Sequence, residues 1–284
     1  MSRIARLFAC FGLSLAVLAG FRSGPALADQ PHSWSLWMQS PGSPIMESIE
    51  RLNSILTVII VLVVVAVFAL LGYVMVRFRA GRNPHPARWS HNTPLEVAWT
   101  LLPVLILVVI AFPSFRLLFS MDRLREADLT IKVTGHQWYW SYAYPDSGVA
   151  FDSMMVQDDD LPPGEPRLLA TDTHLILPVG VNVRVQITAD DVIHSWSVPS
   201  LGLKTDAIPG RLNETWVRIE QPGKYYGQCS QLCGVNHGFM PIEVEAVPAP
   251  QFAAWLAGQQ AKQKSSDATP VPDGGQTVTR LAQR

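Results

Sequence analysis

Two long stretches without a charged residue constrain this chain more than any other feature. Residues 55–76 form 22 consecutive uncharged positions, and residues 97–115 form 19. At a helical rise of about 1.5 Å per residue, runs of this length match a hydrocarbon core of roughly 30 Å. Buried core helices are the alternative, but two such runs beside one modest soluble domain favour a transmembrane helical hairpin.

Composition agrees with a membrane protein and excludes other classes. The 284 residues are 48% hydrophobic and 16% charged, with 22 basic and 23 acidic side chains and a net charge of −1. A basic nucleic-acid-binding protein and a disordered polyampholyte are therefore excluded. We expect a lipid membrane, and no nucleic acid, among the partners.

Charges between the two runs predict the orientation of the hairpin. Residues 77–96 hold Arg77, Arg79, Arg82 and Arg88 against the single acid Glu96. Short basic loops stay on the cytoplasmic side of a membrane. Residues 29–54 and everything after residue 115 are then exported.

The N-terminus carries the pattern of an export signal. Two arginines precede a short apolar run, and Ala26-Leu27-Ala28 supplies the small residues that a signal peptidase recognises. We expect residues 1–28 to be a cleaved signal peptide; an uncleaved anchor is the alternative. Cleavage removes Cys10 and leaves two cysteines in an oxidising compartment, where cysteines usually pair or bind metal.

Residues 129–247 have the pattern of an all-β sandwich or barrel. Short segments rich in Val, Ile, Thr, Trp and Tyr alternate with Pro, Gly and Asp. The expected strands are 129–134, 137–144, 174–178, 181–188, 193–198, 214–220 and 242–246. Within the C-terminal region 248–284, we expect a short helix over 253–264 and a flexible tail from residue 265.

A cluster of sulfur and nitrogen ligands is the strongest chemical signal. Cys229, Cys233, His237 and Met240 lie within twelve positions, and His194 lies 35 residues before Cys229. Thiolate, imidazole and thioether groups together suit copper. Two thiolates from one loop can bridge two copper ions, with one imidazole for each ion.

Three alternatives to copper are a Cys229–Cys233 disulfide, a Cys2His2 zinc site and chance clustering. Zinc has little use for a thioether, and its usual sites have different cysteine spacings. None of the three accounts for both Met240 and the distant His194.

The sequence resembles subunit II of haem-copper cytochrome c oxidase, of the bacterial type related to the mitochondrial one, over nearly the whole mature chain. The resemblance rests on His91-Asn92-Thr93 with Glu96-Val97-Ala98-Trp99-Thr100, on Gly135-His136-Gln137-Trp138-Tyr139-Trp140, and on residues 191–211 and 225–241. It implies a cupredoxin-like exported domain with a binuclear copper A centre.

The resemblance also implies a ligand set. The side-chain ligands would be His194, Cys229, Cys233, His237 and Met240, and the backbone carbonyl of Gln231 would complete the set. Most relatives carry glutamate at the position of Gln231 and use its carboxylate on a magnesium ion shared with subunit I. A neutral amide is a weaker ligand for this hard cation, so Gln231 would hold magnesium less tightly than glutamate does. A plain hydrogen bond of Gln231 at the subunit interface is the alternative.

The resemblance also implies roles for Trp138 and Glu96. Trp138 matches the tryptophan that admits the electron from cytochrome c, although Ala143 stands where relatives carry an acid. Strand alternation predicts His136, Trp138 and Trp140 on one face and Tyr139 on the other. Glu96 matches the glutamate at the entrance of a proton pathway into subunit I.

An acidic stretch predicts a basic docking partner. Residues 146–191 hold nine acids against Arg167 and Arg184, a local net charge of −7. Such a surface would steer a basic protein towards it; an ordinary solvated loop is the alternative. The nine are Asp146, Asp152, Asp158, Asp159, Asp160, Glu165, Asp172, Asp190 and Asp191.

These observations predict an electron-accepting oxidase subunit in the bacterial plasma membrane, with its N-terminus and copper domain on the periplasmic side. Cytochrome c would be a separate donor, because the chain has no haem-binding C-x-x-C-H motif. The haem of subunit I would receive the electron, and oxygen reduction and proton pumping would occur there, among the other oxidase subunits. A membrane-tethered copper carrier is one rival. A quinol-oxidase homologue is a second, disfavoured because it lacks the copper ligands.

Overall fold

The computed structural model describes residues 30–123 and 126–267. The expected signal peptide of residues 1–28 lies outside the described residues, as does the C-terminal tail beyond residue 267. The C-terminal helix α4 (Ala249–Asp267) extends beyond the predicted 253–264 at both ends.

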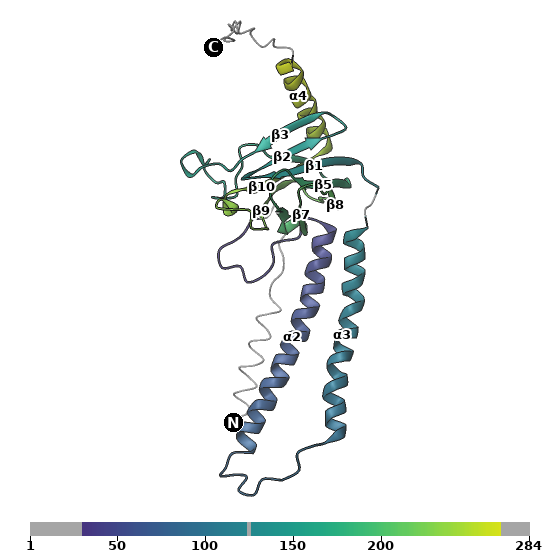
Figure 1. The fold of residues 1–284 in the computed structure, drawn as a ribbon, viewed down its shortest axis with the longest axis vertical. Coiled ribbons are helices and arrows are strands. Elements are labelled where there is room, and N and C mark those ends of the chain that lie inside the picture. The colour runs from purple at the N-terminus through teal and green to yellow at the C-terminus, as the bar shows by residue number, and fades with distance from the viewer. Residues whose placement is uncertain (1–29, 124–125, 268–284) are drawn as a thin grey trace, which may run out of the picture.

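Both uncharged runs lie in long helices, α2 (Pro44–Arg77) and α3 (Thr93–Asp122), which contact each other. Ser43 and Asn92 cap their N-termini by accepting a hydrogen bond from a backbone N–H three residues on, and a proline follows each cap. In Figure 1 the loop between them lies at the end of the hairpin far from the β-domain. The most apolar stretch of each helix is not buried inside the chain, so lipid or other proteins must cover it.

The β-domain consists of two five-stranded sheets. Their strand orders are β3-β2-β1-β5-β8 and β4-β10-β9-β6-β7, with parallel pairs β1·β5 and β10·β4. The strands and the short 3-10 helices are β1 (Leu129–His136), β2 (Tyr139–Tyr144), β3 (Val149–Ser153), η1 (Asp158–Asp160), β4 (Leu175–Pro178), β5 (Val183–Ala189), β6 (His194–Val198), η2 (Pro199–Leu201), β7 (Leu203–Ala207), β8 (Asn213–Val217), β9 (Gly223–Cys229), η3 (His237–Phe239) and β10 (Pro241–Val247).

Alternating apolar side chains of both sheets form one core between them. Val133, Trp140 and Val185 come from the first sheet, and Trp196 and Val244 come from the second; all are fully buried. The predicted membrane hairpin with a cupredoxin-like β-sandwich is therefore confirmed as the fold class. All seven expected strands exist, while β3, β7 and β9 were not predicted from sequence.

The predicted strand 214–220 ends too late, since β8 ends at Val217, and the predicted strand 137–144 begins too early. The expected strand 137–144 begins only at Tyr139, because Gln137 and Trp138 form the tight turn between β1 and β2. His136 therefore belongs to β1, pairs with Tyr139 and stacks on its ring at 4.6 Å between centroids. Alternation cannot place Trp138 on the face of Trp140, since the chain reverses direction between His136 and Tyr139.

The start of α2 is anchored in the β-domain. Ser43 Oγ donates to the carbonyl of Leu201 at 2.7 Å, and Ile45 and Met46 are buried. Gly42 lies so close to the Tyr225 ring that an added Cβ would meet it at 2.4 Å. From α3, the carbonyl of Ser120 accepts a hydrogen bond from Trp216 Nε1. Both helices are thereby fixed against the sandwich at the same end.

A buried carboxylate holds the 158–174 segment against the second sheet. Glu243 on β10 is fully buried; its Oε1 lies 3.0 Å from Lys224 Nζ and 3.2 Å from His174 Nε2. Its Oε2 accepts from the backbone N–H of Thr171. Lys224 also pairs with Glu165 at 2.6 Å.

We predict that Lys224→Met destabilises the β-domain by about 3 kcal/mol, because a buried carboxylate that loses its cation keeps its desolvation cost. The measurement is chemical denaturation of the full-length chain in detergent, followed by tryptophan fluorescence. The control is Arg167→Met, which breaks the exposed pair with Asp158 and should cost less than about 1 kcal/mol. Equal losses in the two variants would contradict the prediction.

Candidate metal centre

Strand pairing brings the predicted ligands together. Pairing of β9 with β10 folds the loop after Cys229 back, so that Met240 O accepts from Cys229 N. Pairing of β6 with β9 sets Trp196 opposite Cys229, and His194, at the start of β6, then lies beside the loop. Gly227 allows the close approach of β6, because a Cβ there would overlap the Ser197 carbonyl oxygen at 2.0 Å.

The five side-chain donors form one compact cluster. Cys229 Sγ lies 3.9 Å from His194 Nδ1 and 3.9 Å from Cys233 Sγ. Cys233 Sγ lies 3.5 Å from His237 Nδ1 and 3.5 Å from Met240 Sδ. Each thiol therefore has its own imidazole, and the two thiols lie between the two rings.

The backbone carbonyl of Gln231 lies at the same cluster. Its oxygen is 3.4 Å from Cys229 Sγ, while the Gln231 side chain is exposed. Both cysteines are free thiols, and their separation is far above the roughly 2.05 Å of a disulfide bond. The structure thus places an oxygen donor on the Cys229 side and a thioether on the Cys233 side.

The cluster is closed to water except at His237. His194 is fully buried, Cys229, Cys233 and Met240 are each at most 6% exposed, and His237 is half-buried. Burial opposes ionisation of Cys229, but hydrogen bonds with His194 and with the backbone of Gln231 and Ser195 outweigh it and lower the pKa of this thiol. Burial and the Cys229 charge raise the pKa of Cys233. A bound cation would remove that repulsion and allow both thiols to ionise.

The donor set fits a soft or borderline metal. Among the described residues, His194, Cys229 and Cys233 have ligand atoms within 4.8 Å of one another. Met240 and His237 border the same thiols. Sulfur and imidazole donors in a dry pocket suit copper, whereas hard cations prefer oxygen.

Asp191 orients the buried histidine, a role that sequence reasoning missed. Its Oδ1 lies 2.8 Å from His194 Nε2, and its Oδ2 accepts from the backbone N–H of Gln137. Burial opposes its ionisation, but these bonds lower the pKa of Asp191. His194 Nδ1 is thereby left to face the thiols. The three-residue spacing of Asp191 and His194 was the signal, but the charge count had placed Asp191 on the docking surface.

Two glycines leave room for the rings around the cluster. An added Cβ on Gly135 would lie 2.9 Å from the His194 ring, and one on Gly234 would lie 3.1 Å from the Trp138 ring. Trp138 therefore packs directly on the backbone that follows Cys233. Gln137 Nε2 donates to the Cys233 carbonyl at 2.7 Å, which ties the Trp138 turn to the loop.

The other predicted residues lie elsewhere. Glu96 stands in the first turn of α3, at the opposite end of the hairpin from the β-domain (Figure 1). Its Oε1 accepts from Asn92 N at 3.1 Å, so it also stabilises that helix end. Of the acidic stretch, Asp158 pairs with Arg167 and Glu165 with Lys224, which reduces its free negative charge.

We predict that Asp191→Ala weakens metal binding by about tenfold to a hundredfold, because loss of an outer carboxylate releases the orientation of a histidine ligand. Competition between the full-length protein and a chelator measures the affinity. Asp190→Ala is the matched control: Asp190 is 78% exposed and lies 3.8 Å from His136, away from the thiols. An equal loss of metal affinity in both variants would show that Asp191 has no specific role at the metal centre.

Known proteins match this chain over both parts. The family described as "Cytochrome C oxidase subunit II, transmembrane domain" matches residues 31–117, and that described as "Cytochrome C oxidase subunit II, periplasmic domain" matches residues 129–247. A probable cytochrome c oxidase subunit 2 of Rickettsia felis is 50% identical. The match covers 84% of this chain and 76% of the Rickettsia protein. A cytochrome c oxidase subunit 2 of Chondrus crispus is 44% identical, and the match covers 81% of this chain and 93% of that protein. The periplasmic domain of subunit II of cytochrome oxidase from Bradyrhizobium japonicum, known from a crystal structure, is 51% identical with a TM-score of 0.47. The match covers 49% of this chain and 99% of that domain. Because the Rickettsia and Chondrus relatives are 50% and 44% identical and are matched over more than two thirds of their length, the chain belongs to the cytochrome c oxidase subunit II family.

Proposed function

We propose that this chain accepts electrons from cytochrome c at a binuclear copper centre and delivers them to the haem of subunit I, where oxygen is reduced to water with coupled proton pumping. The observation that carries the proposal is the pair of buried thiols with one imidazole each, in a member of the subunit II family. A site built around a single thiol would need only one of the two cysteines.

Six residues would hold the copper. They are His194, Cys229, Gln231 through its carbonyl, Cys233, His237 and Met240. When bound there, a pair of copper ions would supply a one-electron relay that spreads the electron over both metals.

The protein's part in this chemistry is to keep the ligands fixed and dry. The Trp140 ring lies edge-on to His194 at 5.9 Å, and its Nε1 donates to the Met240 carbonyl at 3.4 Å. Two candidate ligands, one at the start of β6 and one just before β10, are therefore packed against one fully buried side chain. Little movement of the ligands on a change of charge favours fast electron transfer, because reorganisation adds to the barrier.

Electrons would enter near Trp138. This ring is only partly buried, packs on Gly234 and lies next to the residues that hold Cys233. Cytochrome c would dock on the acidic surface around it, of which Asp190 is strongly exposed. Charge complementarity of this kind raises the rate of encounter and makes it fall with salt.

The copper loop would face subunit I. Leu232 and Val235 are 78% and 82% exposed, and Phe239 is 47% exposed. Neighbouring exposed apolar side chains favour a protein partner. The exposed Gln231 side chain stands in the same loop, where an amide oxygen would bind a shared magnesium ion more weakly than a carboxylate does.

The membrane in this proposal is the bacterial plasma membrane, with the N-terminal segment and copper domain in the periplasm. The arginine-rich segment after Arg77 would then lie in the cytoplasm, and Glu96 beside it would serve the proton pathway into subunit I. A copper carrier would need neither arrangement. Copurification with a haem-containing subunit of many spans tests this, since a carrier would purify alone.

Replacing Cys233 with Ser should abolish the spectrum of a delocalised copper pair, because a hydroxyl is a poor replacement for a thiolate ligand of copper. Electron paramagnetic resonance of the purified oxidase complex measures it. Ser230→Ala, an exposed change in the same loop, should keep the spectrum. An unaltered spectrum in the Cys233 variant would remove this residue from the site.

Replacing Trp138 with Ala should slow electron transfer from cytochrome c at least tenfold and leave the copper spectrum unchanged, because the ring lies outside the ligand set. Stopped-flow reduction by cytochrome c measures the rate. Trp89→Ala alters an exposed tryptophan of the loop between the helices and should have no effect. Normal turnover of the Trp138 variant would exclude its role.

A further inference from the structure

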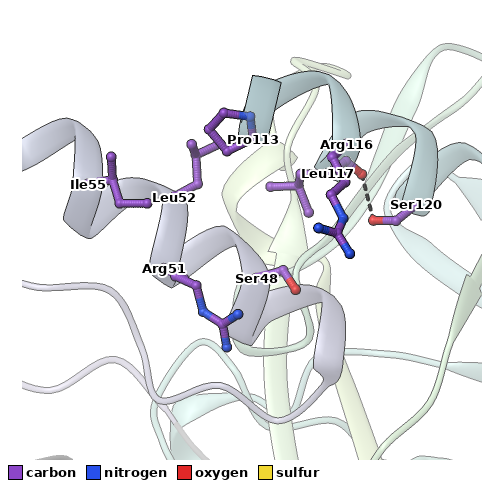
Figure 2. Close-up of a pocket in the computed structure, with 8 residues that line it drawn as sticks. All are labelled: Ser48, Arg51, Leu52, Ile55, Pro113, Arg116, Leu117 and Ser120. Atoms are coloured by element: carbon purple, nitrogen blue, oxygen red, sulfur yellow. Dashed lines mark hydrogen bonds between the residues drawn. The ribbon is translucent and has the colours of Figure 1, made fainter. Parts of the chain in front are cut away.

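A cleft of about 360 Å³ separates α2 and α3 near the end that meets the β-domain. Figure 2 shows its lining, to which the two helices contribute equally. The lining residues are Ser48, Arg51, Leu52, Ile55, Pro113, Arg116, Leu117 and Ser120. The copper centre uses none of them.

The cleft brings two positive charges together without a negative one. Arg51 comes from α2 and Arg116 from α3, and neither forms an ion pair within residues 30–123 and 126–267. Glu50, the acid next to Arg51 in sequence, accepts a hydrogen bond from Trp37 Nε1 instead. The hydroxyls of Ser48 and Ser120 donate to the carbonyls of Pro44 and Leu117 in their own helices, so the two arginines supply the donors of the lining. Two neighbouring guanidinium groups attract an anion with several acceptor oxygens.

Both arginines stand at the same depth in the membrane. Arg51 precedes the uncharged run 55–76 by one helical turn, and Arg116 directly follows the run 97–115. They therefore mark the boundary of the hydrocarbon layer on the side of the β-domain, where lipid phosphates lie.

The rest of the lining is apolar and reaches into the hydrocarbon layer. Leu52 and Ile55 lie on α2, and Pro113 and Leu117 lie on α3. A cationic rim above an apolar floor matches an amphiphile whose phosphate meets the arginines and whose acyl chain follows the floor. A free anion would leave the floor unused, and a protein partner would have to supply both an acidic group for the arginines and an apolar segment for the floor.

We propose that this cleft binds one anionic phospholipid of the leaflet on the side of the β-domain, with its phosphate between Arg51 and Arg116. The start of α2 and the end of α3 are both hydrogen-bonded to the sandwich, so the cleft has a fixed width. The lipid thereby joins the two helices at the level where the β-domain rests on them.

The test measures lipid retention by the purified oxidase complex. The complex is delipidated and exposed to phosphatidylglycerol, and native mass spectrometry counts the retained molecules. Arg51→Gln with Arg116→Gln should remove one phosphatidylglycerol per complex and weaken its binding about thirtyfold, which follows from roughly 1 kcal/mol for each arginine at a membrane surface. The matched control is Arg79→Gln with Arg82→Gln, at the other end of the hairpin, which should retain that lipid.

A second variant keeps the test decisive if the double variant does not assemble. Leu52→Trp fills the apolar floor without changing a charge, and it should also remove one retained lipid. Unchanged lipid counts in this variant, or in an assembled double variant, would overturn the proposal. Loss of subunit I with an unchanged lipid count would assign the cleft to a protein partner, and displacement of the lipid by millimolar inorganic phosphate would assign it to a free anion. Either result would also overturn the proposal.

Discussion

The pairing of β6 with β9, and of β9 with β10, is the constraint on which the candidate metal centre depends. His194 belongs to β6, Cys229 ends β9, and Met240 immediately precedes β10. Hydrogen bonds between these strands set the positions of three donors before any metal binds. The donors that remain, on Cys233 and His237, lie in the loop that the same pairing closes. Ligand geometry is therefore a property of the sheet, and the energy of the buried sandwich core maintains it.

The second sheet meets the first at this centre. Asp191, after β5, holds His194 from one side, and Gln137, in the turn after β1, holds the carbonyl of Cys233 from the other. Trp138 is the neighbour of Gln137 and packs on Gly234. The partly exposed aromatic ring and the buried thiols are thus joined through a few hydrogen bonds and one ring contact. This connection gives the proposed electron input a short route to the donors.

The membrane hairpin and the sandwich form one unit through a small number of contacts. Ser43 and the buried Ile45 and Met46 anchor α2, and the carbonyl of Ser120 anchors α3. The apolar faces of both helices remain uncovered by this chain. Lipid and the other subunits must therefore cover them, which agrees with a subunit of a larger membrane complex. The arginine-lined cleft lies where these two environments meet.

Sequence by itself determined the hairpin, the β class of the domain and the candidate donor residues, because uncharged runs, strand alternation and ligand chemistry are local properties. The subunit II family was also evident from motifs such as Gly135 to Trp140, and the comparisons confirm it. Only the tertiary structure decided that Trp138 lies in a turn and that Asp191 orients His194. It also decided that Arg51 and Arg116 share a cleft. Trp138 depends on where a strand reverses, and the Asp191 carboxylate is held by the backbone of Gln137, 54 positions away. Arg51 and Arg116 lie on different helices. Sheet pairing and helix packing therefore set these relations.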